Sequence, residues 1–416
     1  MGFIDMMIDW INWMRIRKIN TLNRGVTEYQ PSYVGGFVDV DSYTHNTVIS
    51  GGSPEIRGEA TVALGISALN AGVPMIVLHR GNYVLEQMLS DTFASRGLYV
   101  GVNPKNPCFE PLAGLPGSQI GQILIDAAPS KYALSYDGAS YVEAMRQFIA
   151  ARKRTQPTLT MLVKCPHGNF DALVANAGAN GSITPTQVMS IQSFLIQGQT
   201  QSARVSAYLN GLQRECATIM PHSATSTVRT VGICDALKRK GVFSIDVLSD
   251  GNIHLLRLLA EEIKLAINGG NRFYLVIDGL MLTEENGLKS MITSKSGNCH
   301  VGISADDFYS ACGGDEKLFS TLLGDCHKWF VFRHGSGLSA DMWSKALGEF
   351  EKFEKMGGFG VAGGAPVIVK KPPAPAGVFH KPTPVVYAKQ IQDMQQREGF
   401  VYTASPRELA HIKRFL

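Results

Sequence analysis

Short apolar runs alternate with helix-like segments along two stretches of the chain, and this alternation constrains the fold most. Runs at 47–50, 75–79 and 97–101 are typical of buried strands, while 59–72 and 83–96 have the apolar spacing of helices. The pattern returns with apolar runs at 242–248, 272–280, 299–304 and 328–334. Strands that are joined through helices pair in parallel, because the connection has to cross over the sheet. The sequence therefore predicts an α/β protein with a parallel sheet covered by helices.

The strand pattern is missing between residue 141 and about residue 220. Three helical segments occupy this stretch, at 141–154, 185–199 and 202–216, and they predict an all-α domain inserted at one edge of the sheet. A helix at 339–356 is predicted to close the body, and 357–384 is rich in Gly and Pro, as in a linker. The predicted organisation is an N-terminal amphipathic helix (1–24), a core (25–140 and 226–356), the all-α domain (141–225), and a Pro/Gly-rich linker with a basic C-terminal segment (357–416).

The N-terminal segment, from Met1 to Ile19, has apolar residues at helical spacing. Trp10 and Trp13 lie just before a basic cluster that includes Arg17, and aromatic rings beside cations suit a membrane interface. Two interpretations stay open: contact with an anionic membrane, and docking on a protein partner. Seven scattered cysteines and the lack of a long uncharged apolar stretch indicate a cytoplasmic protein with reduced thiols, and the membrane interpretation would place it on the inner face of the cell membrane.

The segment GGSPEIRGEAT, residues 51–61, lies between an apolar run and a helical one, where a phosphate-binding loop would lie. Such a loop has the motif G-x-x-x-x-G-K-[ST], with the lysine on phosphate and the hydroxyl on Mg²⁺. We align Ser53 and Gly58 with its glycines, Glu59 with the lysine and Ala60 with the hydroxyl residue, which leaves Thr61 one residue late. A carboxylate about 4 Å from a phosphate oxygen is repelled by about 4 kcal/mol at an effective dielectric near 20.

The strand-like segment 272–280 includes Asp278, which has the position of a Mg²⁺-associated carboxylate in a nucleotide site. The residue after it, where a general base is expected, is Gly279, and Glu284 and Glu285 could replace that base only through an unusual loop. No cysteine and histidine spacing indicates a metal site. The sequence therefore predicts a degenerate nucleotide site with no cofactor and no metal.

The order of these segments resembles the cytosolic part of type IV secretion coupling proteins, the membrane-anchored, hexameric DNA-pumping ATPases of conjugation. The likeness lies in 45–82 (first strand, loop, helix, second strand), 102–115 (with Glu110 in place of an Asp), 241–279, 306–355 and 387–404. It implies a RecA-like P-loop NTPase core with an all-α insertion. A phosphate-sensing glutamine of that family would fall within 303–305, where this chain has Ile, Ser and Ala.

Three hypotheses follow. The first is a coupling-protein-like pseudo-ATPase that acts as a scaffold, recruitment or regulatory component of a type IV secretion or conjugation apparatus, with its subunits, DNA or a relaxase cargo as partners, in a homo- or hetero-oligomer. The second is an active DNA-translocating ATPase with an atypical site for ATP and Mg²⁺, in which Arg333 acts as an arginine finger. The third is an unrelated α/β enzyme built on His79, Arg80, Asp278 and His300, all near strand ends.

Overall fold

The computed structural model describes residues 13–14, 17, 32–34, 42–221, 229–293, 297–355, 378–404 and 407–413. In these ranges the main sheet has ten strands, and neighbouring strands are parallel except where β11 pairs antiparallel with β8 and with β12. Their spatial order is β1 (Ser32–Val34), β12 (Arg407–Ile412), β11 (Gly399–Ala404), β8 (Lys328–Phe332), β2 (Thr47–Ser50), β7 (Cys299–Ala305), β6 (Phe273–Asp278), β3 (Met75–His79), β5 (Val242–Asp246), β4 (Tyr99–Val102). The predicted α/β architecture with a mostly parallel sheet is confirmed.

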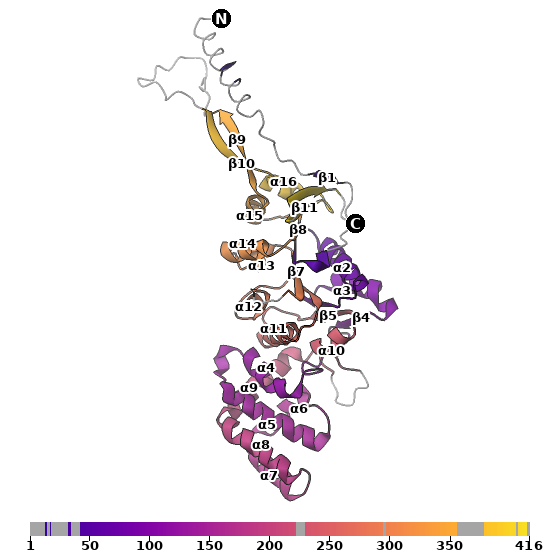
Figure 1. Cartoon of the computed structure of the whole chain (residues 1–416), viewed down its shortest axis with the longest axis vertical. Coiled ribbons are helices and arrows are strands. Elements are labelled where there is room, and N and C mark those ends of the chain that lie inside the picture. The colour runs from indigo at the N-terminus through magenta and orange to yellow at the C-terminus, as the bar shows by residue number, and fades with distance from the viewer. Residues whose placement is uncertain are drawn as a thin grey trace, which may run out of the picture.

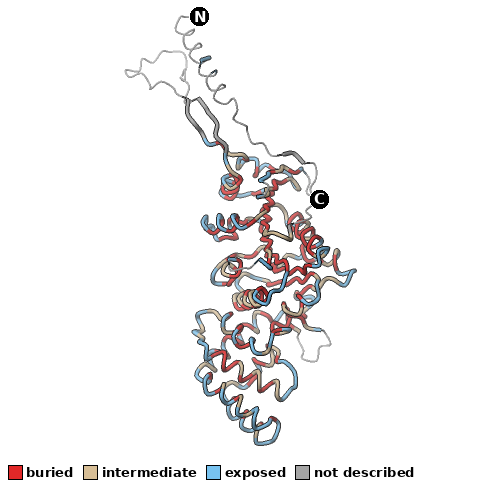
Figure 2. Tube along the Cα trace, in the orientation of Figure 1, coloured by how far each residue is buried: buried red, intermediate tan, exposed pale blue. Residues whose placement is uncertain are grey.

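Helices cover both faces of the sheet (Figure 1). One face carries α2 (Pro54–Asn70) and α3 (Tyr83–Phe93). The opposite face packs against α10 (Ile233–Lys238), α11 (Ile253–Asn268), α12 (Leu288–Thr293), α13 (Phe308–Ala311), α14 (Glu316–Gly324), α15 (Gly337–Leu347) and α16 (Ala388–Asp393). Because strands between two helical layers are buried on both sides, β2, β3, β5 and β6 are buried at every residue (Figure 2).

Most of the segment between β4 and β5 forms a block of helices at one end of the molecule (Figure 1). These are α4 (Ile120–Ala127), α5 (Tyr136–Lys153), α6 (Leu159–Val163), α7 (Phe170–Ala179), α8 (Pro185–Gly198) and α9 (Ser202–Cys216). Helices α5 and α8 touch backbone to backbone, since a Cβ added at Gly198 would lie 2.4 Å from the amide nitrogen of Tyr141. The apolar core of this block is continuous with the core beneath α11.

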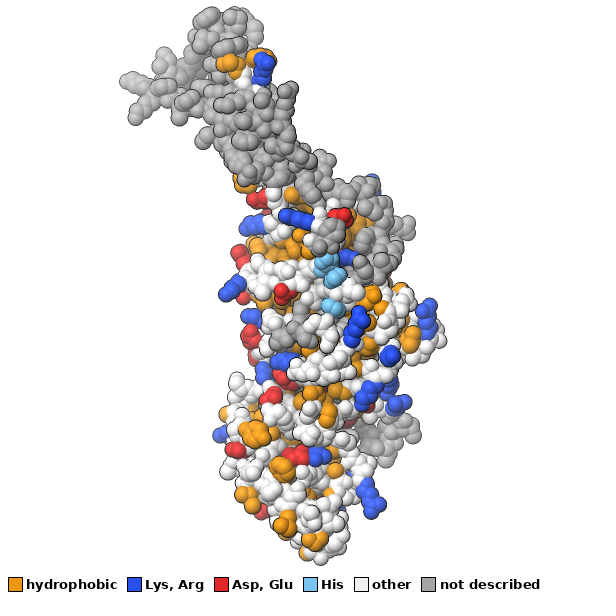
Figure 3. Space-filling view, viewed as in Figure 1, with side chains coloured by type: hydrophobic (Ala, Val, Ile, Leu, Met, Phe, Trp, Pro, Cys, Tyr) orange, Lys and Arg blue, Asp and Glu red, His pale blue; other side chains and the backbone are white. Residues whose placement is uncertain are grey.

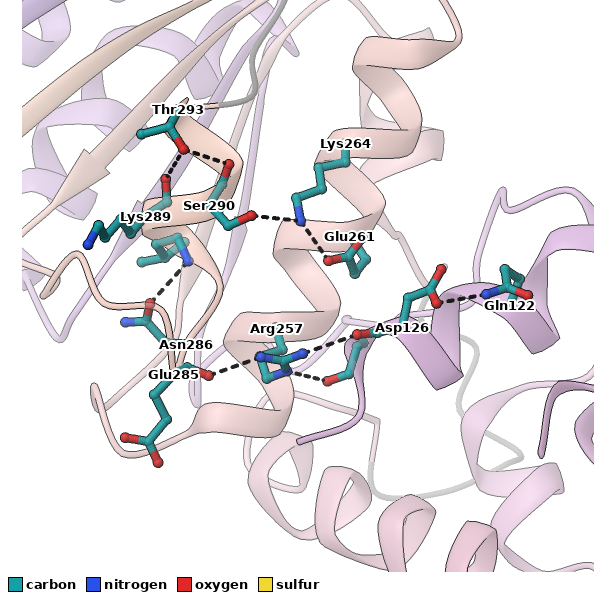
Figure 4. Close-up of polar contacts among 12 residues, drawn as sticks. Gln122, Asp126, Arg257, Glu261, Lys264, Glu285, Asn286, Lys289, Ser290 and Thr293 are labelled. Atoms are coloured by element: carbon teal, nitrogen blue, oxygen red, sulfur yellow. Dashed lines mark hydrogen bonds and ion pairs between the residues drawn. The ribbon is translucent and has the colours of Figure 1, made fainter. Parts of the chain in front are cut away.

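Arg257 on α11 fixes the helical block to the sheet (Figure 4). Its Nε donates to the carbonyl of Ala127 at 2.8 Å, and its other nitrogens donate to the carbonyls of Asp126 at 3.2 Å and Glu285 at 3.4 Å. The first two carbonyls lie at the C-terminal end of α4, where a cation satisfies groups that the helix leaves without partners. One side chain therefore joins α4, α11 and the loop before α12.

Glu110 makes a second junction between the two parts. Its Oε1 accepts backbone N–H bonds from Leu112 at 3.2 Å and from Leu159, at the start of α6, at 2.9 Å. The side chain is buried, and burial raises the pKa of its carboxyl to about 6 although the two N–H donors act in the opposite direction. The folded protein therefore takes up this proton at a higher pH than the unfolded chain does.

Glu110→Gln is expected to stabilise the protein at pH 8 and to have much less effect at pH 5. An acid whose pKa is raised by folding destabilises the folded state above that pKa, and this effect fades as pH falls toward its ordinary value of 4.5. The shift from 4.5 to about 6 corresponds to about 2 kcal/mol at most. Urea unfolding at the two pH values measures the difference, with exposed Glu408→Gln as the control. An equal change at both pH values would contradict the expectation.

The predicted helix at 339–356 is wrong in its second half. Helix α15 ends at Leu347, and Gly348 has a φ of +100°, a conformation that favours glycine and ends the helix. Residues Glu349–Lys355 form β9, which pairs antiparallel with β10 (Val378–Pro384), so the end of the predicted linker is also a strand. Pairing between two distant segments overrides the helical spacing of 349–355.

The C-terminal segment adds α16 and two strands of the main sheet, β11 beside β8 and β12 beside β1. The predicted amphipathic helix at 1–24 falls mostly outside the described residues. Of that segment the structure describes Trp13, Met14 and Arg17, which are helical and exposed, with the Arg17 guanidinium carbon 5.2 Å from the centroid of the Trp13 ring. Within the described ranges, no helix combines the length and the apolarity needed to cross a membrane.

Candidate functional site

Four polar side chains lie in register across the carboxyl ends of neighbouring strands. Asp246 on β5 pairs with His79 on β3, His79 with Asp278 on β6, and Asp278 with Ser304 on β7. All four are buried. Val77 on β3 belongs to the apolar cluster beneath α2 and α3. His79, two residues later, faces the same side of the sheet, so the row points toward those helices. This edge of a parallel sheet is where α/β proteins bind ligands.

Asn82 organises the row, and the sequence reasoning missed it. Its Nδ2 donates to Asp278 Oδ2 at 2.7 Å, and its backbone N–H donates to His79 Nδ1 at 3.3 Å. Its Oδ1 accepts from the Leu85 amide at 3.0 Å, which caps α3. The available signal was an asparagine between an apolar strand and a helical segment, a preferred N-cap residue. With the Ser304 hydroxyl 2.5 Å from Oδ1, both oxygens of Asp278 are bonded.

The other members of the row are held in a similar way. Asp246 Oδ1 accepts from the amides of Gly81 and Leu248, each at 2.8 Å. Burial lowers the pKa of His79, against the opposing charges of nearby carboxylates. A neutral His79 that accepts at Nδ1 carries its proton on Nε2. In the described part of the chain, no three His, Cys, Asp or Glu residues are arranged to hold a metal ion.

The connection between β2 and α2 is a turn of three residues, 51–53. In a P-loop the glycine-rich part of the motif G-x-x-x-x-G-K-[ST] lies between the strand and the start of the helix, and its N–H groups surround the phosphates. Here the Gly51 amide donates to the Ala305 carbonyl at 3.0 Å, and the Gly52 amide donates to the Arg333 carbonyl at 2.8 Å. Helix α2 then begins with Pro54, which has no N–H. The amides of Gly51 and Gly52 therefore bond to backbone at or just after the ends of the neighbouring strands β7 and β8, and not to a ligand.

Arg57, in the first turns of α2, approaches Asp278. Its Nε lies 4.0 Å from Asp278 Oδ1, one terminal nitrogen donates to the Gly52 carbonyl at 3.0 Å, and the side chain is buried. Counted from Gly51, the residue directly after β2, the lysine position of the motif falls on Arg57, and the position of its second glycine falls on Ile56. Glu59, which the sequence alignment put at that position, instead pairs with Arg397 on the segment before β11. The repulsion expected from Glu59 is therefore offset by a cation.

The remaining aligned residues have structural places in α2. Ser53 is its N-cap residue, and Ala60 is buried in the core. Thr61 Oγ1 donates to the Arg57 carbonyl at 2.9 Å within the helix. Gly58 makes room for α3, since a Cβ there would lie 2.8 Å from the sulfur of Met88.

A buried network of hydrogen bonds packs behind the 51–53 turn. Ser50 Oγ lies 2.9 Å from His334 Nε2, and it accepts from the amide of Phe308 at 3.1 Å and from the indole of Trp343 at 3.2 Å. His334 Nδ1 lies 2.8 Å from the Phe332 carbonyl, to which it donates, so Nε2 accepts the Ser50 hydroxyl proton. Burial lowers the pKa of His334. Ser50 is fully buried with its bonding capacity used, so this Ser–His pair is a packing element and not a nucleophile with its base.

Arg333 is exposed at the end of β8, and its Nε donates to the Gln392 carbonyl at 3.1 Å. Glu284 and Glu285 are exposed on the loop before α12, where Glu284 lies 3.5 Å from Lys289. Neither carboxylate is packed into the buried row of Asp278.

The four-residue cluster of the third hypothesis is not assembled. His79 and Asp278 are neighbours in the sheet, and Arg80 pairs with Asp250 nearby. His300 is the second residue of β7, at the opposite, amino end of the sheet, where its ring centroid lies 6.5 Å from that of His45. The prediction that all four share a site is wrong, because His300 lies at the start of Cys299–Ala305 and the carboxyl end of that strand is at Ala305.

Comparison with models of known protein families gave no match, and no curated protein matched the sequence. Solved structures do match. The bacterial conjugative coupling protein TrwBdeltaN70, in its unbound monoclinic form, superimposes with a TM-score of 0.54 and 14% identity, covering 95% of this chain and 91% of that chain. This chain has the fold of TrwB. The likeness agrees with the predicted α/β fold built on a mostly parallel sheet, and the helices α4–α9 are compatible with the all-α insertion.

Structures of plasmid coupling protein TrwB with nucleotides match equally well. The complex with ADP and Mg²⁺ has a TM-score of 0.54 at 14% identity, covering 94% of this chain and 90% of that chain. The complex with the non-hydrolysable GTP analogue GDPNP has a TM-score of 0.53 at 16% identity, with coverage of 94% and 91%. The shared fold extends over nearly the whole of both chains, whereas the turn at 51–53 departs from the motif that binds phosphate.

Proposed function

We propose that this chain is a coupling-protein-like pseudo-ATPase, which serves a type IV secretion or conjugation apparatus as a scaffold, recruitment or regulatory component. The observation that carries the proposal is the three-residue turn between β2 and α2, together with Arg57 directed at Asp278. The likeness to TrwB along almost the full length supports the setting. Under this proposal the chain has the fold of a coupling protein but does not hydrolyse nucleotide.

The chemistry of the site supports this loss of activity. A working P-loop combines N–H donors, a lysine on the phosphates and a hydroxyl on Mg²⁺. In this chain the amides of Gly51 and Gly52 are bonded elsewhere, and Arg57 lies against Asp278. If Arg57 moved to a phosphate, the buried carboxylate of Asp278 would lose its nearest cation, which is costly in a protein interior. Gly279, after Asp278, offers no base to orient water.

The proposed partners are subunits of the secretion apparatus, with DNA or a relaxase as cargo, in a homo- or hetero-oligomer. Contact with the inner face of the cell membrane through residues 1–19 belongs to the same proposal, motivated by the exposed Trp13 beside Arg17. The second candidate is an active ATPase that binds ATP and Mg²⁺ once the turn rearranges. The exposed guanidinium of Arg333 favours it, because an arginine finger has to reach a neighbouring subunit.

Isothermal titration calorimetry with ATP and Mg²⁺ is expected to show no saturable heat up to a nucleotide concentration of about 1 mM, which corresponds to binding weaker than about 4 kcal/mol. Phosphate release should equal that of buffer. Glu59→Lys/Ala60→Thr is expected to bind no better, because these positions face Arg397 and the core.

Micromolar binding by the parent protein that is lost in Arg57→Ala would contradict the pseudo-ATPase proposal and favour the second candidate. Arg333→Ala would then test the arginine finger: it should lower the rate of hydrolysis and leave binding unchanged. If no variant binds, the proposal stands.

A further inference from the structure

A cavity of about 950 Å³ opens between the helical block and the segment that follows β4. Its walls come from the C-terminal half of α5, from α6 with the residues on either side of it, from α9, and from Glu110. This volume is at the upper end of what small-molecule pockets offer, so it also suits a short stretch of polymer. The cavity lies away from the row of Asp278, because none of its lining residues belongs to a strand of the sheet.

Four cations surround the cavity: Arg152, Lys153, Lys164 and Arg214. All four side chains are exposed, and in the described part of the chain none has a carboxylate within ion-pair distance. Arg152 lies over the ring of Phe148, with its guanidinium carbon 5.6 Å from the centroid. Unneutralised charges of one sign around a concave, partly apolar surface raise the local concentration of ligands of opposite sign.

The interior of the cavity distinguishes between kinds of anion. Among the described residues, the one acidic side chain that lines it is the buried Glu110, which disfavours any anion placed against it, so the anionic groups of a ligand belong at the cationic rim. The uncharged lining is partly apolar, with Ile149, Met161 and Met220, and partly polar, with Thr, Asn and Gln side chains; among the described residues it has one aromatic ring, that of Phe148. Single-stranded nucleic acid is held by several aromatic rings that stack on bases, which this cavity lacks. Aliphatic walls and a cationic rim fit a peptide in which apolar and acidic side chains alternate.

We propose that this cavity binds an extended protein segment rich in acidic and apolar residues, with its carboxylates on the four cations and its apolar side chains on the aliphatic walls. The inference goes beyond the proposed function, because it does not depend on the state of the nucleotide site. It specifies charge pairing and apolar contact as the interactions by which a recruitment component would bind its partner.

A fluorescein-labelled peptide of about eight residues, alternating Glu and Leu and roughly 27 Å long when extended, tests the proposal by fluorescence anisotropy on the full chain. Lys164→Glu/Arg214→Glu is expected to weaken binding about tenfold or more, because two attractive charges become repulsive. The control is Arg96→Glu/Arg239→Glu, which makes the same change of net charge at the sheet edge near α3, β4 and α10, where Lys and Arg side chains also gather (Figure 3). This control should bind the peptide about as tightly as the parent.

Two further probes complete the test. A peptide with Lys in place of Glu should not bind, and a thymidine oligonucleotide of similar length should bind weakly, with the same loss in both double variants. Equal weakening of the Glu–Leu peptide by the two pairs of substitutions would overturn the proposal, since it would show general electrostatic attraction. Tighter binding of the oligonucleotide, lost only in Lys164→Glu/Arg214→Glu, would overturn it in favour of nucleic acid. Circular dichroism of each variant confirms that it is folded.

Discussion

Ser50→Ala is expected to lower the free energy of unfolding by about 3 kcal/mol or more, since each buried polar group left without a partner costs about 1–3 kcal/mol. The Ser50 hydroxyl bonds His334 Nε2, the Phe308 amide and the Trp343 indole, and all four residues are buried. Alanine removes the one oxygen that these three groups share. The three lie in separate parts of the chain, namely just after β8, at the start of α13 and in the middle of α15.

Urea unfolding at neutral pH measures this effect, with Ser193→Ala as the control. The Ser193 hydroxyl donates to the Ser190 carbonyl at 2.7 Å, but it is exposed on α8, so water replaces the lost bond and a change below about 0.5 kcal/mol is expected. A loss below about 1 kcal/mol in Ser50→Ala would show that the network contributes little, and that the turn at 51–53 is held by other contacts.

The parallel sheet could be predicted because its central strands are buried on both faces. Segments such as Phe273–Asp278 must then be apolar at every position until the chain reaches the polar edge, and such runs are conspicuous in a sequence. Helices α5, α8 and α9 were predicted for a related reason, since each has a buried stripe at helical spacing. Burial requires apolar residues at the spacing of each helix or strand, and this spacing predicts the fold class.

The geometry of the candidate site is harder to predict from the sequence. The sequence alignment assigned the motif by the glycine at position 58. In the structure, the motif is instead counted from the end of β2, and its lysine position then falls on Arg57. Pro54 was the available signal, because proline is favoured in the first turn of a helix and so places the start of α2 there. The partner of Glu59 is Arg397, 338 residues away, and no local pattern predicts such a pair.

The strand at Glu349–Lys355 shows the same limit. Its local spacing favours a helix, and it becomes a strand by pairing with Val378–Pro384 across a long connection. Tertiary pairing of this kind overrides local preference, which is weak for short segments.

The first glycine of the turn, Gly51, is where conformation and close packing coincide. Its φ is +83°, a region that side chains disfavour. A Cβ added to Gly51 would lie 2.6 Å from His334 Cε1 and 2.7 Å from the Arg333 carbonyl oxygen. In a P-loop such a glycine lets the backbone surround a phosphate. In this chain the missing side chain lets Arg333 and His334, just after β8, pack directly against the turn.

Gly51→Ala is therefore expected to destabilise the protein by about 2–5 kcal/mol, because about 1–2 kcal/mol of backbone strain adds to about 1–3 kcal/mol for steric overlap in a packed region. Gly72→Ala separates the two effects: Gly72 has a φ of +71°, but an added Cβ would meet nothing within 4 Å. The control should lose only about 1–2 kcal/mol, the strain alone. Chemical unfolding of both variants beside the parent measures the difference. Equal losses would show that β8 yields easily and that the turn can open, and an opening turn would weaken the case against nucleotide binding. A loss at Gly51 at least about 1.5 kcal/mol larger than at Gly72 would show a turn closed by rigid packing.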